Sequence, residues 1–313
     1  MSTENGKYVA DDNGRLDKRK AVKGFAEFCC SPVQNKDTWQ ESAENYKVRN
    51  TKLEYTYPLK LLVPGCASSI PSSQWLYVIT FGGGLVEGDN VSLDVKVGEH
   101  CTVVVTTQAS TKVYHSEEGL VTQQGLRGLV ADGGLLAVLP DPVVCFKNAI
   151  YSQKQDFELT SNGSVIILDW FTAGRVALGE VWDMTSYKSH NRVFVDGKQV
   201  YGDSIFLSNE NSFLSLKESM CGVMVLGTCV FIGPYFKEIK KKIKERVSVL
   251  TKCNDMSVVK KDLMAFASVL DPSLCDGIVV KLITTQSTEE AYNFFRMVIQ
   301  DVVPRLGGDP LVK

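Results

Sequence analysis

The clearest pattern in the chain is a period of two near residue 90. Apolar residues alternate with polar ones from Val91 to Val97, which is typical of a strand with one buried face. A turn at Gly98-Glu99 interrupts the alternation, and a β-branched run, 102–107, follows it. Two strand-like segments joined by a short glycine-containing turn favour a β-hairpin, so we predict one here.

Similar turns recur along the next hundred residues. Glycine-containing turns flanked by strand-like residues lie at Gly98, Gly133, Gly163 and Gly197, about every 30 to 35 residues. Asn-Gly and Asp-Gly pairs suit tight turns because both central positions need positive φ. The spacing predicts units of one hairpin plus a return strand, stacked as β-helix-like layers. Only the turns recur, so periodicity alone does not establish a solenoid.

The last third of the chain, residues 234–313, has a mixed α/β pattern. A helix is predicted from Phe236 to Leu250, because apolar residues recur every three or four positions and most lysines lie opposite them. Two apolar strands follow. A second helix is then predicted to start with Thr288 as its N-cap and to stop at Pro304.

These patterns predict a β-rich α+β fold with two main helices in the last third. The 313 residues are 44% hydrophobic, which suffices for a sizeable core. We expect one domain over residues 21–313, β-rich up to residue 233. Residues 1–20 are polar and charged, so we expect a disordered tail there.

Charge, hydropathy and cysteine usage indicate which partners and which compartment to expect. The net charge of −2 gives no electrostatic reason to expect binding to nucleic acid. No apolar run reaches the length of a membrane helix, and the N-terminus lacks the apolar core of a secretory signal. Nine scattered cysteines favour reduced thiols. We therefore expect a cytoplasmic protein with neither nucleic acid nor membrane as its partner.

A glycine-rich element carries the first candidate site. Gly82, Gly83 and Gly84 are followed by Gly88-Asp89, and a segment rich in small polar residues comes after the predicted hairpin, with Thr107, Gln108 and Lys112. Gly82 to Glu87 breaks the Gly-x-Gly-x-x-Gly pattern at its last position, and no Gly-Lys-Ser/Thr follows, so neither of these phosphate-binding motifs is present. One interpretation is a tight bend with close backbone packing. The other is a backbone-lined passage or partner-contact edge with Asp89 at its mouth.

A second element places Asp169, Arg175 and Glu180 among apolar residues. Buried charges are normally paired, so Arg175 is expected to pair with Asp169 or with Glu180. The alternative is a polar interior path for a cation or water. The histidines are isolated from one another, but His115 lies near Glu117 and Glu118, and imidazole and carboxylate groups suit a transient Ni(II) site.

Several of these motifs resemble the family of urease accessory proteins called UreD, or UreH in some systems. The matching segments occur in family order: GGGLVEGD, TTQASTKVY, Leu139-Pro140-Asp141-Pro142, and Gly174-Arg175 with Gly179-Glu180. The segment LPDPVVCF is similar to the sequences of the plant and fungal branch of this family. The resemblance spans roughly residues 24 to 203 and implies a β-rich stack of strands with two helices near the C-terminus.

The resemblance implies a maturation chaperone without enzymatic activity. Proteins of this kind bind apo-urease and a helical UreF-type protein that recruits a UreG-type GTPase, and together they deliver nickel. No tightly bound cofactor is expected, only transient Ni(II). Asp89 and Glu180 carry over as tunnel or interface groups, followed by Arg175, Thr107, Gln108 and Lys112. The C-terminal helix, with Thr288 and Phe295, and the following Arg305 are expected on the UreF side.

Two other hypotheses remain open from the sequence. A β-helix-type carbohydrate-active enzyme would need two carboxyl groups at a set separation, for which Asp89 and Glu180 are the candidates. A purely structural β scaffold would use the same two carboxylates to close internal ion pairs. Replacing Glu180 with Gln distinguishes a path from an ion pair, since only the second role predicts loss of folding.

Overall fold

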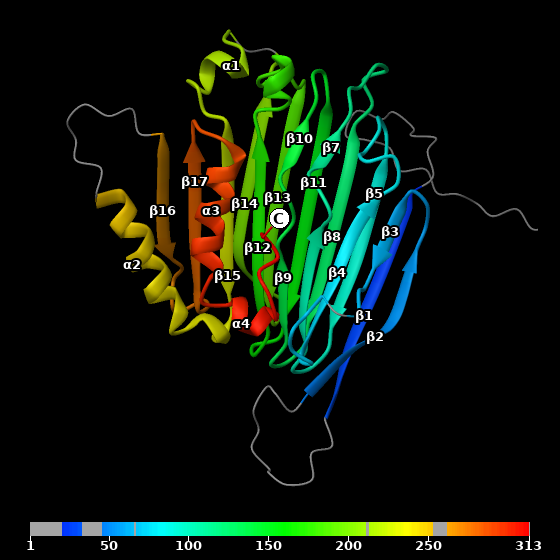
Figure 1. Ribbon diagram of the computed structural model, residues 1–313, viewed down its shortest axis with the longest axis vertical. Coiled ribbons are helices and arrows are strands. Elements are labelled where there is room, and N and C mark those ends of the chain that lie inside the picture. Colours follow the sequence, from blue (N-terminus) through cyan, green and yellow to red (C-terminus); the bar gives the residue numbers. More distant parts are fainter. Residues whose placement is uncertain (1–20, 33–45, 66, 211–212, 253–261, 313) are drawn as a thin grey trace, which may run out of the picture.

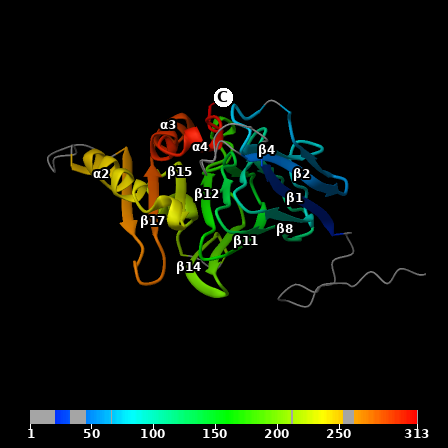
Figure 2. The ribbon, with the colours of Figure 1, turned by 90° about the horizontal axis from the view of Figure 1, so that it is seen from below.

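Two facing β-sheets and a layer of helices make up the protein (Figures 1 and 2). This computed structural model describes residues 21–32, 46–65, 67–210, 213–252 and 262–312. The tail predicted at residues 1–20 lies outside the described residues. The β-rich stack with two main C-terminal helices is confirmed.

Sheet one has seven strands in the order β14-β13-β11-β8-β5-β1-β2. They are β1 (Val22–Pro32), β2 (Tyr46–Tyr55), β5 (Asn90–Val97), β8 (Thr122–Val130), β11 (Ile150–Leu159), β13 (Ser186–Val195) and β14 (Lys198–Ser208). The inner strands are parallel, so that Val91 lies opposite Val22 on one side and Gln124 on the other. The edge strands β2 and β14 are antiparallel to their neighbours.

Sheet two has ten strands, eight of them in the order β16-β17-β15-β12-β9-β6-β4-β3. These are β3 (Leu59–Leu62), β4 (Ser73–Thr80), β6 (Thr102–Thr107), β9 (Leu135–Val138), β12 (Ser164–Thr172), β15 (Val225–Ile232), β16 (Leu263–Val269) and β17 (Gly277–Thr284). The short strands β7 (Thr111–Val113) and β10 (Val143–Cys145) pair with each other, and β10 also pairs with β12.

Most of the predicted hairpins are wrong. β5 and β6 lie in different sheets, and the turn at Gly98 carries the chain from one sheet to the other. The turns at Gly133 and Gly163 do the same for the next two layers. Only the turn at Asp196-Gly197 joins neighbouring antiparallel strands, β13 and β14, as a hairpin.

The burial of the strands explains the crossing. β5 and β11 alternate between buried and exposed side chains, because one face of sheet one meets solvent. β12 is buried at all nine positions, and β6 and β9 are nearly or fully buried. Such continuous apolar runs are typical of parallel strands covered on both faces. They therefore belong in a second sheet, which the helices cover (Figure 2).

The helices are α1 (Leu216–Ser219), α2 (Ile239–Lys252), α3 (Thr288–Ile299) and α4 (Val303–Leu306), with short 3-10 helices at η2 (Val176–Leu178) and η3 (Pro234–Phe236). Two predicted boundaries are wrong. Ser287 is the N-cap of α3, and Thr288 is its first helical residue. Pro304 lies in the first turn of α4, where proline is tolerated, beyond the end of α3.

The core has two layers. One lies between the sheets, and the other lies between sheet two and the helices. In the second layer Phe295 packs edge-on against Trp170, with ring centroids 5.4 Å apart. No helix in the described ranges has both the length and the hydropathy to cross a membrane.

Candidate functional site

The glycine element, residues 82–89, lies beside the polar segment that follows β6. A parallel β-bridge between Leu85 and Val113 joins them. Leu85 N–H donates to the Lys112 carbonyl at 2.8 Å. A Cβ on Gly84 would lie 2.7 Å from that carbonyl oxygen, so only glycine fits there without a shift. Gly82 and Gly83 have positive φ, and the Tyr114 hydroxyl donates to the Gly82 carbonyl. These contacts form a tight bend with close backbone packing, the first of the two interpretations of the glycine element.

Glu87 organises the neighbouring loop, a role that sequence reasoning missed. Its carboxylate accepts hydrogen bonds from the Ser116 hydroxyl and from the backbone N–H groups of Glu117, Glu118 and Leu120, at 2.6 to 3.0 Å. Burial alone raises the pKa of Glu87, but these four hydrogen bonds outweigh it and lower the pKa to about 2. Glu87 therefore holds the loop as an ionised anion.

Asp89 and Thr107 have local roles. The Asp89 carboxylate accepts a hydrogen bond from Val86 N–H at 2.8 Å and closes the turn before β5. Thr107 donates through its hydroxyl to Asp141 at 3.1 Å and accepts from Asp141 N–H at 2.9 Å. Gln108 and Lys112 are exposed.

Arg175 pairs with Glu180, which decides between the two partners that the sequence left open. Arg175 Nε donates to Glu180 at 2.7 Å, the guanidinium makes a second bond to the same carboxylate, and Lys147 N–H donates to it as well. The pairing lowers the pKa of Glu180 and raises that of Arg175. The guanidinium also lies over the Phe146 ring, 3.9 Å from its centroid.

Asp169 instead lies buried between the two sheets. It accepts hydrogen bonds from Gln153, Ser189 and Asn191, at 3.1, 2.6 and 2.6 Å, all from strands of sheet one. Burial raises the pKa of this carboxyl group, although the three hydrogen bonds act in the opposite direction. Neither Arg175 nor any other cation is among these contacts, so neutral polar groups solvate the carboxyl group.

A cavity of about 70 Å³ adjoins Asp169 and extends between the sheets to Asp141 and Thr111. The side-chain oxygens of Gln155 and Asn191 have no hydrogen-bond partner among the described residues, and Gln155 lines the cavity. The space is large enough for about two water molecules. The interior is thus a pocket with a largely apolar lining that also carries two carboxyl groups, Asp141 and Asp169, and amide and hydroxyl side chains.

The signal for this pocket is visible in the sequence. Glutamine, serine and asparagine occupy inward positions of β8, β11 and β13, where apolar residues are expected: Gln124, Gln153, Gln155, Ser189 and Asn191. The sequence alone does not bring these residues together, because their strands become neighbours only when the chain crosses between the two sheets.

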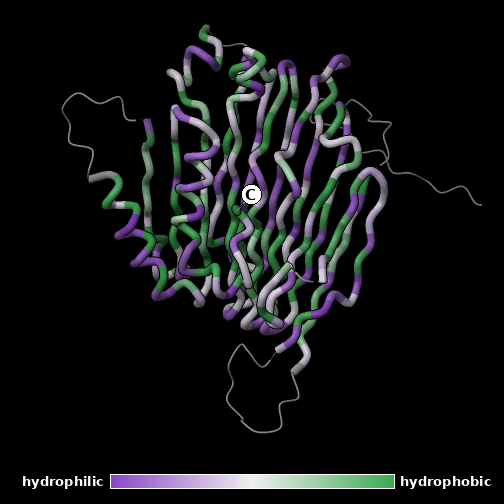
Figure 3. The backbone as a smooth tube through the Cα atoms, viewed as in Figure 1, coloured by the Kyte–Doolittle hydropathy of each residue, from purple (hydrophilic) through white to green (hydrophobic). Residues whose placement is uncertain are grey.

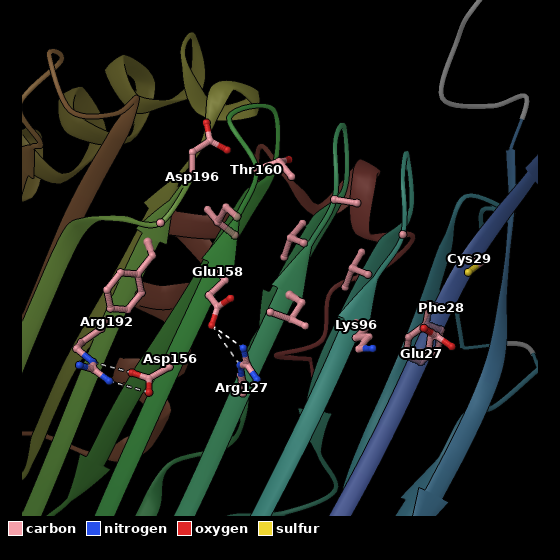
Figure 4. A pocket seen from close by; sticks show the side chains of 18 residues that line it. Glu27, Phe28, Cys29, Lys96, Arg127, Asp156, Glu158, Thr160, Arg192 and Asp196 are labelled. Carbon is pink, nitrogen blue, oxygen red and sulfur yellow. Dashed lines mark hydrogen bonds and ion pairs between the residues drawn. The ribbon is translucent and has the colours of Figure 1, made fainter.

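A wider groove of about 800 Å³ runs across the outer face of sheet one (Figure 4). Four of its charged side chains form ion pairs: Arg127 pairs with Glu158 at 2.8 Å, and Arg192 pairs with Asp156 at 2.7 Å. Neither Asp89 nor Glu180 lines this groove or the interior cavity. The two carboxylates proposed for glycoside chemistry are therefore engaged in separate loops.

His115 lies 3.2 Å from Glu117, and both side chains are mostly exposed. Throughout the described residues, no three His, Cys, Asp or Glu side chains are grouped so that they could hold a metal ion. The set of His115, Glu117 and Glu118 is accordingly not preassembled. The Glu118 backbone instead binds Glu87.

The C-terminal candidates differ in exposure. Thr288 is partly exposed at the start of α3, whereas Phe295 is fully buried against Trp170 and Gly227. Arg305 is partly buried, with its guanidinium 6.0 Å from the centroid of the Tyr235 ring. Phe295 therefore anchors α3 and does not present a side chain to a partner.

The fold and the site define a class of protein. It is a two-sheet stack of strand layers, with closely packed loops and a small polar pocket between the sheets. The profile of the family described as UreD urease accessory protein matches residues 40–313. The chain therefore belongs to the UreD family.

Individual relatives agree with this assignment. Urease accessory protein D of Arabidopsis thaliana is 36% identical over 272 residues, covering 81% of this chain and 92% of the relative. Urease accessory protein UreD of Anaeromyxobacter sp. (strain Fw109-5) is 36% identical over 256 residues, covering 82% and 81%. An uncharacterized urease accessory protein ureD-like from Schizosaccharomyces pombe is 30% identical over 269 residues, covering 82% and 90%.

Proposed function

We propose that this chain is a non-enzymatic scaffold in the cytoplasm that binds apo-urease and a UreF/UreG-type complex and passes Ni(II) to the urease active site. The observation that carries the proposal is the polar pocket at Asp169, inside the core of a UreD-family protein. A buried carboxyl group beside unpartnered amide oxygens is costly unless something polar is accommodated there. A cation in transit would use these groups.

The chemistry of the pocket suits transfer. Its candidate ligands are carboxyl, amide and hydroxyl oxygens, and a nickel ion on such ligands exchanges more readily than one on thiolates or several imidazoles. Burial raises the pKa of Asp169, and a cation arriving beside this carboxyl group would favour its ionised form. The pocket thus offers a weak intermediate position for nickel, which is the cargo of the protein.

The candidate contact for the UreF-type partner is the region around α3. Its exposed side carries Glu289, Asn293 and Arg296, and Thr288 and Arg305 lie at either end. Truncation before Thr288 would remove the buried Phe295 and so unfold the second core layer. A better test is Asn293→Lys, which changes only an exposed position. We expect this variant to weaken capture of a UreF-type partner and to leave the unfolding midpoint unchanged.

The maturation role is tested by co-expressing this chain with apo-urease and the other accessory proteins of its source. We expect nickel-dependent urease activity and nickel bound to urease only when the chain is present. Pull-down with tagged urease should recover the chain together with the UreF-type protein. Full activation and full nickel content in its absence would refute the proposal.

A further inference from the structure

We infer that the free edge of β16 binds an acidic, extended segment of a partner protein, which joins sheet two as an added strand. Among the described strands, only β17 pairs with β16. An open strand edge presents unpaired N–H and C=O groups to any chain that can align with it. This inference does not depend on nickel delivery, since it concerns binding of a peptide segment alone.

The backbone of β16 shows which groups are free. The Asp262 carbonyl and Leu270 N–H bond to the β17 side, to Thr285 and Gly277. Because backbone groups alternate in direction along an antiparallel strand, the even-numbered residues between them also face β17. The N–H and C=O groups of the odd-numbered residues therefore point outward. These residues are Leu263, Ala265, Ala267 and Val269.

The other three sheet edges are protected. β2 carries four charged residues, Lys47, Arg49, Lys52 and Glu54. β3 has only four residues. The pairing of β14 with its neighbour contains a β-bulge, and β14 carries Asp203, which pairs with Lys281. Charges, shortness and bulges are the usual devices that block edge pairing. β16, with the sequence LMAFASV, has none of them.

Apolar side chains border this edge. Phe266 of β16 is 58% exposed, and it projects from the face opposite α2. Val249 and Leu250, in the last turns of α2, are 58% and 39% exposed. Figure 1 places α2 and β16 together at one side of the molecule, and Figure 3 shows mainly hydrophobic colouring along β16. A strand added here would cover this apolar surface.

The charge of α2 identifies the kind of partner. Residues 239–250 contain five lysines and arginines and one glutamate. Lys240 and Arg246 are already paired, with Asp276 and Asp301 at 2.6 Å. Exposed lysines remain, at Lys241, Lys242 and Lys244. Within the described part of the chain, only Lys241 of these three approaches a carboxylate, that of Glu245 at 4.0 Å. Acidic side chains on an added strand would complement them.

A second copy of this chain fits the edge less well. Antiparallel pairing of two β16 strands around a twofold axis keeps both α2 helices on the same face of the joined sheet. Two lysine-rich helices would then lie beside each other and repel. The charge of the surface thus favours an acidic partner over self-association.

The test uses fluorescently labelled peptides and the full-length chain, with binding followed by fluorescence anisotropy. One peptide alternates valine with glutamate, a second alternates valine with lysine, and a third is the acidic peptide with a central proline. We expect the acidic peptide to bind at least about tenfold more tightly than the other two, and its affinity to fall as salt is raised. Equal binding of all three peptides, or no binding of the acidic one, would overturn the inference.

Two variants locate the site. Phe266→Asp should abolish binding of the acidic peptide, whereas Phe206→Asp, a change at a similarly exposed position on β14, should leave it intact. Lys242→Glu with Lys244→Glu should transfer the preference to the basic peptide. If Phe266→Asp binds the acidic peptide like the wild type, the site is not this edge. A wild-type dimer in light scattering that Phe266→Asp converts to a monomer would identify a second copy as the occupant and overturn the proposal.

Discussion

Replacing Glu87 with Gln tests whether a single ionised carboxylate holds the loop 116–120. Four donors converge on this group, three of them backbone N–H groups of the loop. The substituted glutamine would keep the size of the side chain but lose the charge, and its amide NH₂ would face donors. The variant should therefore lose both electrostatic attraction and hydrogen bonds.

The magnitude follows from the change in pKa. A fall from 4.5 to about 2 corresponds to about 3 kcal/mol if all of it stabilised the folded state. Because Glu87 is only half-buried, solvent screening reduces this, and we expect a loss of about 1–2 kcal/mol in the free energy of unfolding. An acidic group whose pKa is lower in the folded than in the unfolded protein stabilises the fold at pH values above its unfolded pKa. The difference between wild type and variant should thus be full above pH 4.5 and shrink as the pH falls toward 2.

Two measurements check this prediction. Denaturant unfolding at pH 7 and pH 4 gives the difference in stability, and amide hydrogen exchange over residues 116–120 reports on the loop itself. Exchange should accelerate in Glu87→Gln and stay at the wild-type rate in Glu118→Gln, which makes the same change at an exposed carboxylate of the same loop. Equal stability and equal exchange in all three proteins would refute the anchoring role.

Two further substitutions test the neighbouring loops. Gly84→Ala should destabilise the fold by about 1–3 kcal/mol in denaturant unfolding, because its Cβ meets the Lys112 carbonyl oxygen at 2.7 Å. Gly83→Asn should cost about 1 kcal/mol or less, because asparagine tolerates positive φ and its Cβ would meet only the Tyr114 hydroxyl, at 3.8 Å. Similar losses for both would show that close packing at Gly84 is unimportant. Glu180→Gln should keep urease activation within about twofold of wild type, since a partly exposed ion pair contributes little. Loss of activation with the complex still assembled would instead place Glu180 on the path.

The sequence predicted the strand layers because their physical causes are local. Alternation along β5 and glycine turns at Gly98, Gly133 and Gly163 depend on neighbouring residues only. Whether a turn returns along one sheet or crosses to another depends on what covers the following strand. The continuous burial of β12 carries that information, but a short apolar run does not by itself reveal its pairing.

The candidate site was predicted less well for the same reason. Arg175 and Glu180 are five residues apart, so sequence reasoning could offer them as a pair. Glu87 and its loop are about 30 residues apart, and Asp169 meets Ser189 and Asn191 across two sheets. Such contacts exist only after the strands are stacked. Asp169, which the sequence also offers for a polar interior path, is buried in the core, whereas Asp89 closes a local turn.

The most direct test of nickel passage is the nickel content of urease matured by variants of this chain. Asp169→Asn and Gln155→Leu each remove an oxygen ligand of the interior pocket. As a control, Asp156→Asn removes a carboxylate from the outer face of sheet one, next to Gln155 in β11. With equal amounts of assembled complex, we predict markedly reduced nickel per urease for the two interior variants and wild-type nickel for Asp156→Asn. Wild-type nickel loading by folded Asp169→Asn and Gln155→Leu would contradict the interior path.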